Sequence, residues 1–558
     1  MSEHTLAVPP TDTEKLAYVR GPQHRWFFLA HLLAFAGIAW SLYGFARMEY
    51  WTLVFLVPLV FYAAETLLGL RTSTYRRRIS LTDHLAKVEL WAPERHPSVD
   101  VFLPTAGEGL DLLENTYRYV RTIAYPGRVM VHVLDDMDRP EVEALAGAYG
   151  FGYFARPTHE LKKAGNLRYA FDRTDGDQIL ILDADFVPRS DILTDLVPYM
   201  DDPAVGIVQS PQYFPTPKTM GWIERCAGAT QEMFYRFIQP SRDAVGGAIC
   251  VGTSALYRRS ALEAMGGFPK IGHSEDVFTG FELLKIGYQT LYVPINSTQG
   301  ICPDDIDPFI SQQYRWCEGS MELLRGEDFH RHPTITARQR LSFWSGFFYY
   351  FSTAMNVFFA PIPALIMIWL FPERVRAVNL LPLLGVVLLW LVVYPLVMRS
   401  RWRLDVIRVQ TIYGFTHAMA IFDVFFGKPV DWVPSHGTNK ATPLAVKVKK
   451  TIVWYLGVTL SLTIVGLAIR LAQPGYRLVD WWALIAFVGI NLYVFVPVLA
   501  RAAGTLWADR RATRPRIEPA PVDAVTRIAP AALPPVQPNI VAPQPRAVVV
   551  PAEEWSAR

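Results

Sequence analysis

Six long apolar runs constrain the fold of this chain more than any other feature of its sequence. They are residues 26–46, 50–70, 341–371, 379–398, 451–471 and 479–500. Each has at least the ~20 residues that an α-helix needs to cross a hydrocarbon core of ~30 Å. Hydrophobic residues make up 51% of the 558 positions, and the mean hydropathy of +0.17 is high for a soluble protein. We therefore predict a multi-pass membrane protein with about six α-helical spans.

Basic residues indicate which side of the membrane the connecting segments occupy. Six spans would place both termini, and the long segment after the second run, on one side. That side carries ten Lys or Arg residues near the spans, between Arg71 and Lys450, and the other side carries five. Because cytoplasmic loops hold the excess of positive charge, we expect an inner (plasma) membrane protein whose large domain is cytosolic. A net charge of only +3 gives no support to nucleic-acid binding.

The rest of the chain divides into segments of different composition. Polar residues 1–24 and proline-rich residues 506–558 are expected to be disordered tails. Residues 25–70, 341–398 and 451–505 contain the spans, and residues 71–340 are expected to form one soluble domain. Residues 399–450 mix apolar and polar side chains such as His417 and Asp423, which favours an amphipathic helix in the membrane interface followed by a loop.

Strand-like runs separated by helical patterns characterise the soluble domain. Three of them are "VDVFLP" (99–104), "VMVHVLD" (129–135) and "QILILDAD" (178–185). Such alternation is typical of an α/β domain with a largely parallel sheet.

Carboxylates end two of these runs. Asp135 and Asp136 end one, and Asp183 and Asp185 end another. In an open α/β sheet, ligands bind at the carboxyl ends of the strands. Two carboxylates on a short turn can share a hard cation such as Mg²⁺, which also bridges diphosphates. The alternative is a pair of unrelated turns, where aspartate is common for conformational reasons.

Two further motifs have both a local and a functional interpretation. Ser274, Glu275 and Asp276 stand at the start of a predicted helix, where capping and the helix dipole favour these residue types. Lys162 and Lys163 precede another predicted helix and would suit either a phosphate or solvent.

Taken in order, these motifs resemble the processive family 2 glycosyltransferases, specifically the cellulose synthase catalytic subunit and its relatives. The matching segments are "DVFLPTAGE" (100–108), "LDDMD" (134–138), "KAGNL" (163–167), "DADFVP" (183–188), "VQSPQYF" (208–214), "GTSALYRR" (252–259), "SED" (274–276) and "QQYRW" (312–316). The resemblance implies a GT-A glycosyltransferase domain inserted between transmembrane helices. It also implies a nucleotide-sugar donor and an inverting transfer.

The resemblance further assigns roles to individual residues. The expected UDP-sugar ligands are Thr105, Glu108, Asp135, Asp136, Lys163, Asp183, Gln312 and Arg315. Asp185 would hold Mg²⁺ or Mn²⁺, and Asp276 would be the general base. Trp316 and Glu275 would contact the acceptor, and a planar guanidinium at Arg315 suits a diphosphate.

The activity implied by the resemblance is elongation of a β-linked glucan from UDP-glucose, with passage of the product through the protein's own spans. Another UDP-sugar, or a non-processive transferase that makes a glycolipid, remains an alternative. A transporter or membrane scaffold is a third hypothesis, which the intact carboxylates disfavour. An accessory export subunit or a second copy of the chain stays open as a partner.

The sequence departs from the family pattern at several places. Gln313 stands where cellulose synthases often have a second arginine, and Val251 separates Cys250 from Gly252. A gating loop is expected in residues 428–443, where either Trp432 or Thr438 could set the register. The C-terminal tail has no strand pattern of the length that a PilZ barrel needs, so direct regulation by such a domain is not expected.

Overall fold

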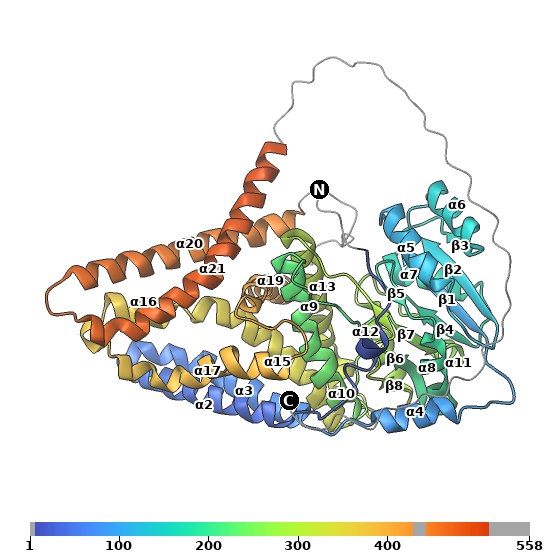
Figure 1. Cartoon of the computed structure of the whole chain (residues 1–558), viewed down its shortest axis with the longest axis horizontal. Coiled ribbons are helices and arrows are strands. Elements are labelled where there is room, and N and C mark those ends of the chain that lie inside the picture. The colour runs from blue at the N-terminus through green and yellow to red at the C-terminus, as the bar shows by residue number, and fades with distance from the viewer. Residues whose placement is uncertain (1–5, 428–441, 513–558) are drawn as a thin grey trace, which may run out of the picture. The chain divides into compact units, whose positions relative to one another are not determined.

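A seven-stranded mixed sheet organises the soluble domain (Figure 1). Its strands, in spatial order, are β3 (Gly152–Ala155), β2 (Val129–Asp135), β1 (Val99–Thr105), β4 (Gln178–Ile181), β7 (Ala255–Arg258), β6 (Val205–Gln209) and β8 (Gln289–Tyr292). β1 is parallel to β2 and β4, β2 is parallel to β3, and β6 is parallel to β8. β7 runs antiparallel to both β4 and β6. The sheet is largely parallel, as expected, with one reversed strand, β7, inside it.

The computed structural model describes residues 6–427 and 442–512. The proposed gating loop lies almost wholly outside the described residues, as does most of the C-terminal tail.

Alternating side chains of β1 explain why this sheet is buried on both faces. Val99, Val101 and Leu103 belong to one apolar cluster, whereas Phe102 belongs to another. Because successive side chains of a strand point to opposite faces, both faces need helices to cover them. The helices of the domain are α4 (Leu81–Glu89), α5 (Leu110–Val120), α6 (Pro140–Tyr149), α7 (Lys162–Phe171), α8 (Ile192–Leu196), α9 (Trp222–Glu232), α10 (Gln239–Asp243), α11 (Arg259–Ala264), α12 (Glu275–Lys285), α13 (Ile306–Arg325) and α14 (Glu327–Arg331). A second, two-stranded sheet pairs β5 (Val187–Pro188) with β9 (Thr298–Gln299).

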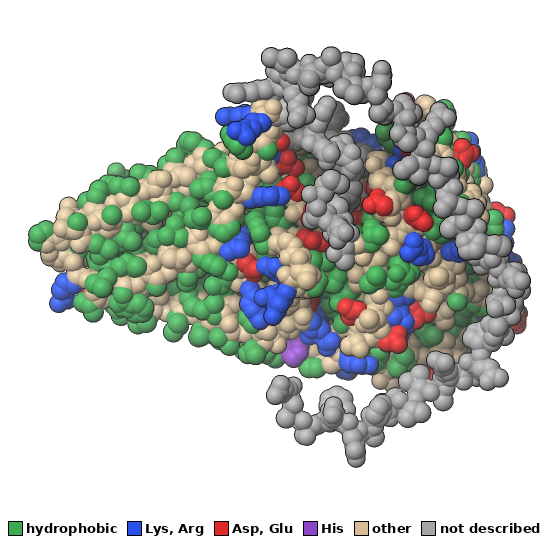
Figure 2. Space-filling model, turned by 45° about the horizontal axis from the view of Figure 1, so that its top comes forward, with side chains coloured by type: hydrophobic (Ala, Val, Ile, Leu, Met, Phe, Trp, Pro, Cys, Tyr) green, Lys and Arg blue, Asp and Glu red, His purple; other side chains and the backbone are tan. Residues whose placement is uncertain are grey.

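Six helical segments of the described chain are long and apolar enough to cross a membrane, as predicted. They are α2 (Trp26–Ala46), η1 with α3 (Tyr50–Phe55, Leu56–Ser73), α15 with α16 (Ala337–Phe359, Ile362–Trp369), η5 through α18 (Ala377–Val397), α20 (Pro443–Ala472) and α21 (Leu478–Ala512). Pro361 separates α15 from α16, since proline removes a backbone donor and clashes with the preceding turn. Figure 2 shows hydrophobic side chains covering the long helices, with Lys, Arg, Asp and Glu gathered beyond one end of them.

α19 (Val406–Phe426) is the helix that was expected to lie in the membrane interface. It packs against α13 and α15, and both of its polar residues named above are buried there. His417 Nδ1 lies 2.8 Å from the Thr353 hydroxyl, and Tyr314 donates a 3.1 Å hydrogen bond to Asp423. The polar groups that suggested an interface therefore have partners inside the protein.

The expectation of a disordered tail over residues 1–24 is wrong for residues 6–24. This segment contains α1 (Asp12–Lys15) and packs on the domain, with Ala7, Tyr18 and Val19 buried. Asn296 donates both its backbone and its side-chain N–H to carbonyls of this segment. Hydrogen bonds from residues almost 300 positions away thus order a stretch that looks polar in isolation.

Candidate active site

The carboxyl ends of β1, β2 and β4 meet at one edge of the sheet, as predicted. Thr105 and Asp135 are register partners at the ends of β1 and β2. Asp183 and Asp185 follow β4 directly, and the Asp183 backbone N–H donates to the Thr253 hydroxyl at 2.9 Å. The loop before β7 reaches the same edge because β7 runs antiparallel to its neighbours.

Arg139 joins the predicted nucleotide-binding residues into one network. Its guanidinium lies 3.2 Å from an Asp135 carboxylate oxygen and donates to the Thr105 hydroxyl at 2.9 Å and to the Glu108 carbonyl at 2.7 Å. Thr105 in turn donates to the Glu108 carboxylate at 2.5 Å. Tyr153 also donates to Asp135, which is fully buried. Sequence reasoning missed Arg139, although its position just before the helix-starting Pro140 placed it at the same strand edge.

Asp136 has a different set of partners from Asp135. Arg156 approaches its carboxylate to 2.7 Å and also donates to the carbonyls of Glu160 and Lys162. Asp136 therefore fixes, through Arg156, the segment that leads into Lys163. Arg156 is a second residue that the sequence did not single out.

Lys163 lies among carboxylates at the part of the sheet edge where β4 ends. Its Nζ is 2.6 Å from Asp183 and 3.4 Å from Glu275, and it donates to the Gly252 carbonyl at 3.1 Å. Burial by itself lowers the pKa of Lys163, but Asp183 and Glu275 outweigh it and hold that pKa above its ordinary value. Burial raises the pKa of Asp183 to about 6, although Lys163 opposes the shift. Glu275, which was expected at the acceptor, thus faces the Lys163 side of the site.

The predicted metal ligand Asp185 stands beside Asp183. Among the described residues, no three His, Cys, Asp or Glu side chains form a set that could hold a metal ion. A cation at Asp185 would therefore take most of its ligands from water and a bound diphosphate. This arrangement fits Mg²⁺ or Mn²⁺, which favour oxygen ligands and are commonly held by one or two carboxylates plus phosphate.

Asp276 follows a turn that packs against the loop before β7. Gly252 has φ +76°, and a Cβ there would lie 2.9 Å from an Asp276 carboxylate oxygen, so glycine is required on both counts. Burial raises the pKa of Asp276 to about 7, with the Glu275 carboxylate adding to the shift. The Val277 N–H donates to Asp276 at 2.8 Å, which orients the carboxylate.

α13 carries Gln312, Arg315 and Trp316, and it brings Arg315 and Trp316 to the site. Burial lowers the pKa of Arg315, while Glu275, Asp183, Glu318 and Asp276 oppose the shift, so Arg315 lies within the field of the acidic groups. Trp316 and Gln313 face a cavity that Asp276 also lines, and Gln312 and Arg315 are not among its lining residues. Asp276 therefore stands between the groups around Lys163 and this cavity.

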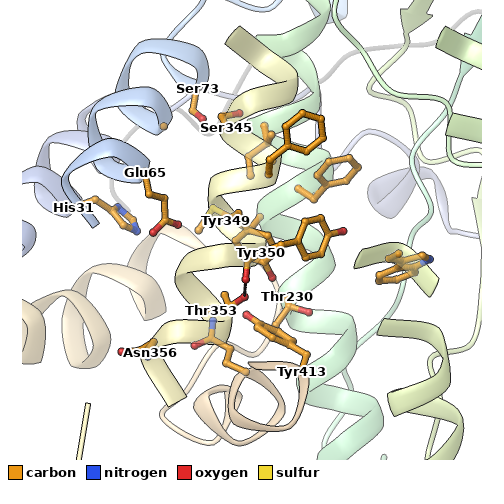
Figure 3. Close-up of a pocket in the computed structure, with 18 of the residues that line it drawn as sticks. His31, Glu65, Ser73, Thr230, Ser345, Tyr349, Tyr350, Thr353, Asn356 and Tyr413 are labelled. Carbon is orange, nitrogen blue, oxygen red and sulfur yellow. Dashed lines mark hydrogen bonds between the residues drawn. The ribbon is translucent and has the colours of Figure 1, made fainter. Parts of the chain in front are cut away.

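The cavity has a volume of about 690 Å³ and extends from Asp276 into the membrane-spanning helices. Figure 3 shows its walls there: Tyr349, Tyr350 and Thr353 on α15, and Glu65 on α3. Glu65 is a carboxylate within the candidate membrane span Tyr50–Ser73. His31 of α2 lies on the same side and makes a 2.8 Å hydrogen bond with the Tyr394 hydroxyl. Trp454 of α20, by contrast, is 68% exposed and does not line the cavity.

Comparisons with known proteins agree with this geometry. Residues 178–398 match the family model described as "Glycosyl transferase family group 2". The chain is 33% identical over 282 residues to "Cellulose synthase 1" of Komagataeibacter xylinus, covering 49% of this chain and 18% of that protein. It is 31% identical over 347 residues to the "Cellulose synthase 1 catalytic subunit", UDP-forming, of the same organism, covering 61% of this chain and 45% of that protein. The chain thus spans less than half the length of these relatives.

Among solved structures, a mannosyltransferase from Pyrobaculum calidifontis, in complex with GDP-Man and Mn²⁺, covers 67% of this chain and 99% of its own. The TM-score is 0.46 and the sequence identity is 17%.

Proposed function

We propose that this chain, which contains a family 2 glycosyltransferase domain between membrane spans, is a processive inverting synthase of a β-linked glucan. The donor is UDP-glucose, and the growing polymer leaves through the cavity among the spans. One observation supports this most strongly: Asp276 and Trp316 line a single cavity of about 690 Å³ that continues between the membrane helices. A transferase that releases a small product needs no such continuation.

The donor would bind along the sheet edge from β2 to β4. Thr105, Glu108, Asp135 and Asp136 would surround the nucleoside, held in place by Arg139 and Arg156. Lys163, Arg315 and Gln312 would meet the diphosphate. A diphosphate beside Lys163 would add negative charge next to Asp183 and Glu275, which already surround that lysine, so further positive charge from Arg315 and a divalent cation would be needed.

Asp185, with Asp183 beside it, would hold Mg²⁺ or Mn²⁺ against the diphosphate. When bound, such a cation offsets the charge that develops on the leaving UDP. The chain's own contribution would be these two carboxylates and the Lys163 ammonium, which lies 2.6 Å from Asp183.

Asp276 would remove the proton from the acceptor hydroxyl as that oxygen attacks the sugar and UDP departs from the opposite face. A pKa of about 7 suits this role, because a general base works best when its pKa is near the working pH. The flat face of Trp316 would support the terminal sugar of the polymer in the cavity.

The alternatives predict different products, so one experiment separates them. The full chain, reconstituted into lipid nanodiscs, is incubated with radiolabelled UDP-glucose and Mg²⁺, and in parallel with other UDP-sugars. A high-mass product sensitive to a β-glucanase supports the proposal. A small lipid-soluble product would instead indicate a glycolipid transferase, and incorporation only from another UDP-sugar would change the donor. No incorporation from any donor would contradict an enzymatic role for the chain alone.

Localisation and assembly belong to the same proposal. The excess of basic residues beside the spans supports a glycosyltransferase domain in the cytosol beneath an inner membrane. An accessory subunit that receives the polymer on the other side would be needed only for export beyond that membrane.

A further inference from the structure

The turn before α12 adopts a backbone conformation that its sequence does not favour. Ser274 has φ 52° and ψ 34°, in the left-handed region that residues with a Cβ rarely occupy. A serine or threonine at a helix start is normally extended, and its hydroxyl accepts a hydrogen bond from the first turn. Thr336 does this at the start of α15, but Ser274 makes no such bond to α12. Its side chain therefore serves another contact.

That contact is with α13. The Ser274 hydroxyl points to the Arg315 carbonyl at 3.5 Å and lies directly against Gly319. A Cβ built at Gly319 would overlap both the Cβ and the Oγ of Ser274. The left-handed turn and a side chain at position 319 are consequently incompatible.

A second contact lies one turn further along α13. His273 Nε2 pairs closely with the Glu322 carboxylate. Arg315, Gly319 and Glu322 are spaced four and three residues apart, so they share one face of the helix. The charged groups around His273 are Glu322 and Glu318 on α13 and Lys162 at the start of α7. The hydrogen bond with Glu322 raises the pKa of His273, and Lys162 opposes the shift.

We propose that Gly319 is a positioning residue for Asp276. By leaving room for Ser274, it lets the turn 272–275 dock on the same helix that carries Arg315 and Trp316. Contact with this one face of α13 then fixes the position of Asp276, the proposed base, relative to Arg315, which would bind the diphosphate, and Trp316, which would bind the acceptor. This inference rests on the proposed function and adds to it a residue with no chemistry of its own.

A double-mutant cycle tests the proposal in the full chain in nanodiscs. Gly319→Ala should lower the kcat of sugar transfer about 100-fold, the scale expected for a displacement near 1 Å at a reacting centre. The Kd for UDP should change far less than kcat, because Lys163 keeps its contact with Asp183, which lies outside the turn. In a Ser274→Gly background the same Gly319→Ala change should have little effect, since glycine accepts positive φ and presents no atoms to overlap. Gly147→Ala, at an exposed helical glycine with no neighbour near the new methyl, is the matched control.

Hydrogen exchange supplies a readout that needs no enzymatic activity. The Phe278 N–H donates to the Ser274 carbonyl, so exchange at residues 275–278 should accelerate in Gly319→Ala and return to the parental rate in the double variant. Full turnover in Gly319→Ala would overturn the proposal, as would a folded double variant that stays as impaired as Gly319→Ala. Ser274→Gly without any turnover would overturn it too, because the hydroxyl itself would then be required. If the exchange pattern holds but the unmodified chain transfers no sugar, the proposed function fails and the packing inference survives.

Discussion

Asp276 is held at the meeting point of three segments that are distant in the sequence. Gly252 approaches it from the loop before β7, Lys163 adds the positive charge of α7 nearby, and α13 supports the preceding turn. Its carboxylate borders both the acidic edge and the cavity. The surroundings of this residue therefore decide whether the site can act as a transferase.

Asp276→Asn should reduce kcat by about 10²–10⁴-fold, the usual contribution of a general base. UDP should still bind, because Lys163 keeps its contact with Asp183. Initial rates with labelled UDP-glucose and calorimetric titration with UDP measure the two quantities. Asp172→Asn, at an exposed position of the same domain, is the control, and activity within a few-fold of the parent in Asp276→Asn would remove Asp276 as the base.

The pH dependence of turnover follows from the pKa of about 7 for Asp276. A base acts in its ionised form, and the ionised fraction falls as pH drops below the pKa. We expect kcat to rise as pH increases through about 7 and then to level off. A kcat that is flat from about pH 6 to about pH 8 would contradict this assignment. The residual activity of Asp276→Asn should not show the rise of kcat with pH.

Trp316→Ala should shorten the product and lower the rate of elongation far more than it weakens UDP binding. Trp316 lines the cavity beyond Asp276 and does not contact the nucleotide edge. Product length by gel filtration and UDP affinity by calorimetry give the comparison. Trp454→Ala is the control, since that ring is 68% exposed on the membrane surface. Equal losses of binding and elongation would argue for a purely structural role of Trp316.

Among the elements, the strands with their terminal aspartates could be predicted and the N-terminal segment could not. The apolar runs that form β1, β2 and β4 are local, so the sequence shows both where they end and which carboxylates follow. The order of residues 6–24 depends instead on Asn115, Asn296 and Asp195, which lie far along the chain. The partners of His417 and Asp423 on α19 could not be predicted for the same reason, because they come from α15 and α13.

Lys15 anchors α1 to the domain through a buried ion pair. Its Nζ lies 2.8 Å from Asp191 and 2.8 Å from Asp195, and Asp195 is 3% exposed. Lys15→Met should destabilise the protein by up to ~3 kcal/mol, because it leaves a buried carboxylate without its cation. Lys87→Met breaks an exposed pair with Asp201 and should cost less than ~1 kcal/mol. Thermal unfolding in detergent compares the two, and equal midpoints would show that the segment adds no stability.

For the chain as a whole, the six spans were predictable because a run of about 20 apolar residues has the length and composition of a transmembrane helix. The cavity among the spans could not be predicted, because its existence depends on which faces of the helices point toward one another. Arg139, Arg156 and Gly319 were also missed, because each acts through a neighbour and carries no motif of its own.

The orientation of the chain can be tested with introduced cysteines. All four native cysteines are buried, so a membrane-impermeant maleimide should give little background. In spheroplasts, Pro474→Cys in the turn between α20 and α21 should react at once. Glu263→Cys, exposed on α11, should react only after the membrane is opened. The reverse pattern would place the glycosyltransferase domain outside the cytosol.

The reversed strand β7 has a consequence for how the chain can vary in length. Its antiparallel course brings the residues before Ala255 to the edge where β4 and β6 finish, and there Gly252 already touches Asp276. An insertion in that entry loop would push backbone into the carboxylate. The same insertion at the exposed residues 202–203, at the opposite end of the sheet, would lie far from Asp276, so natural length variation should collect at that end.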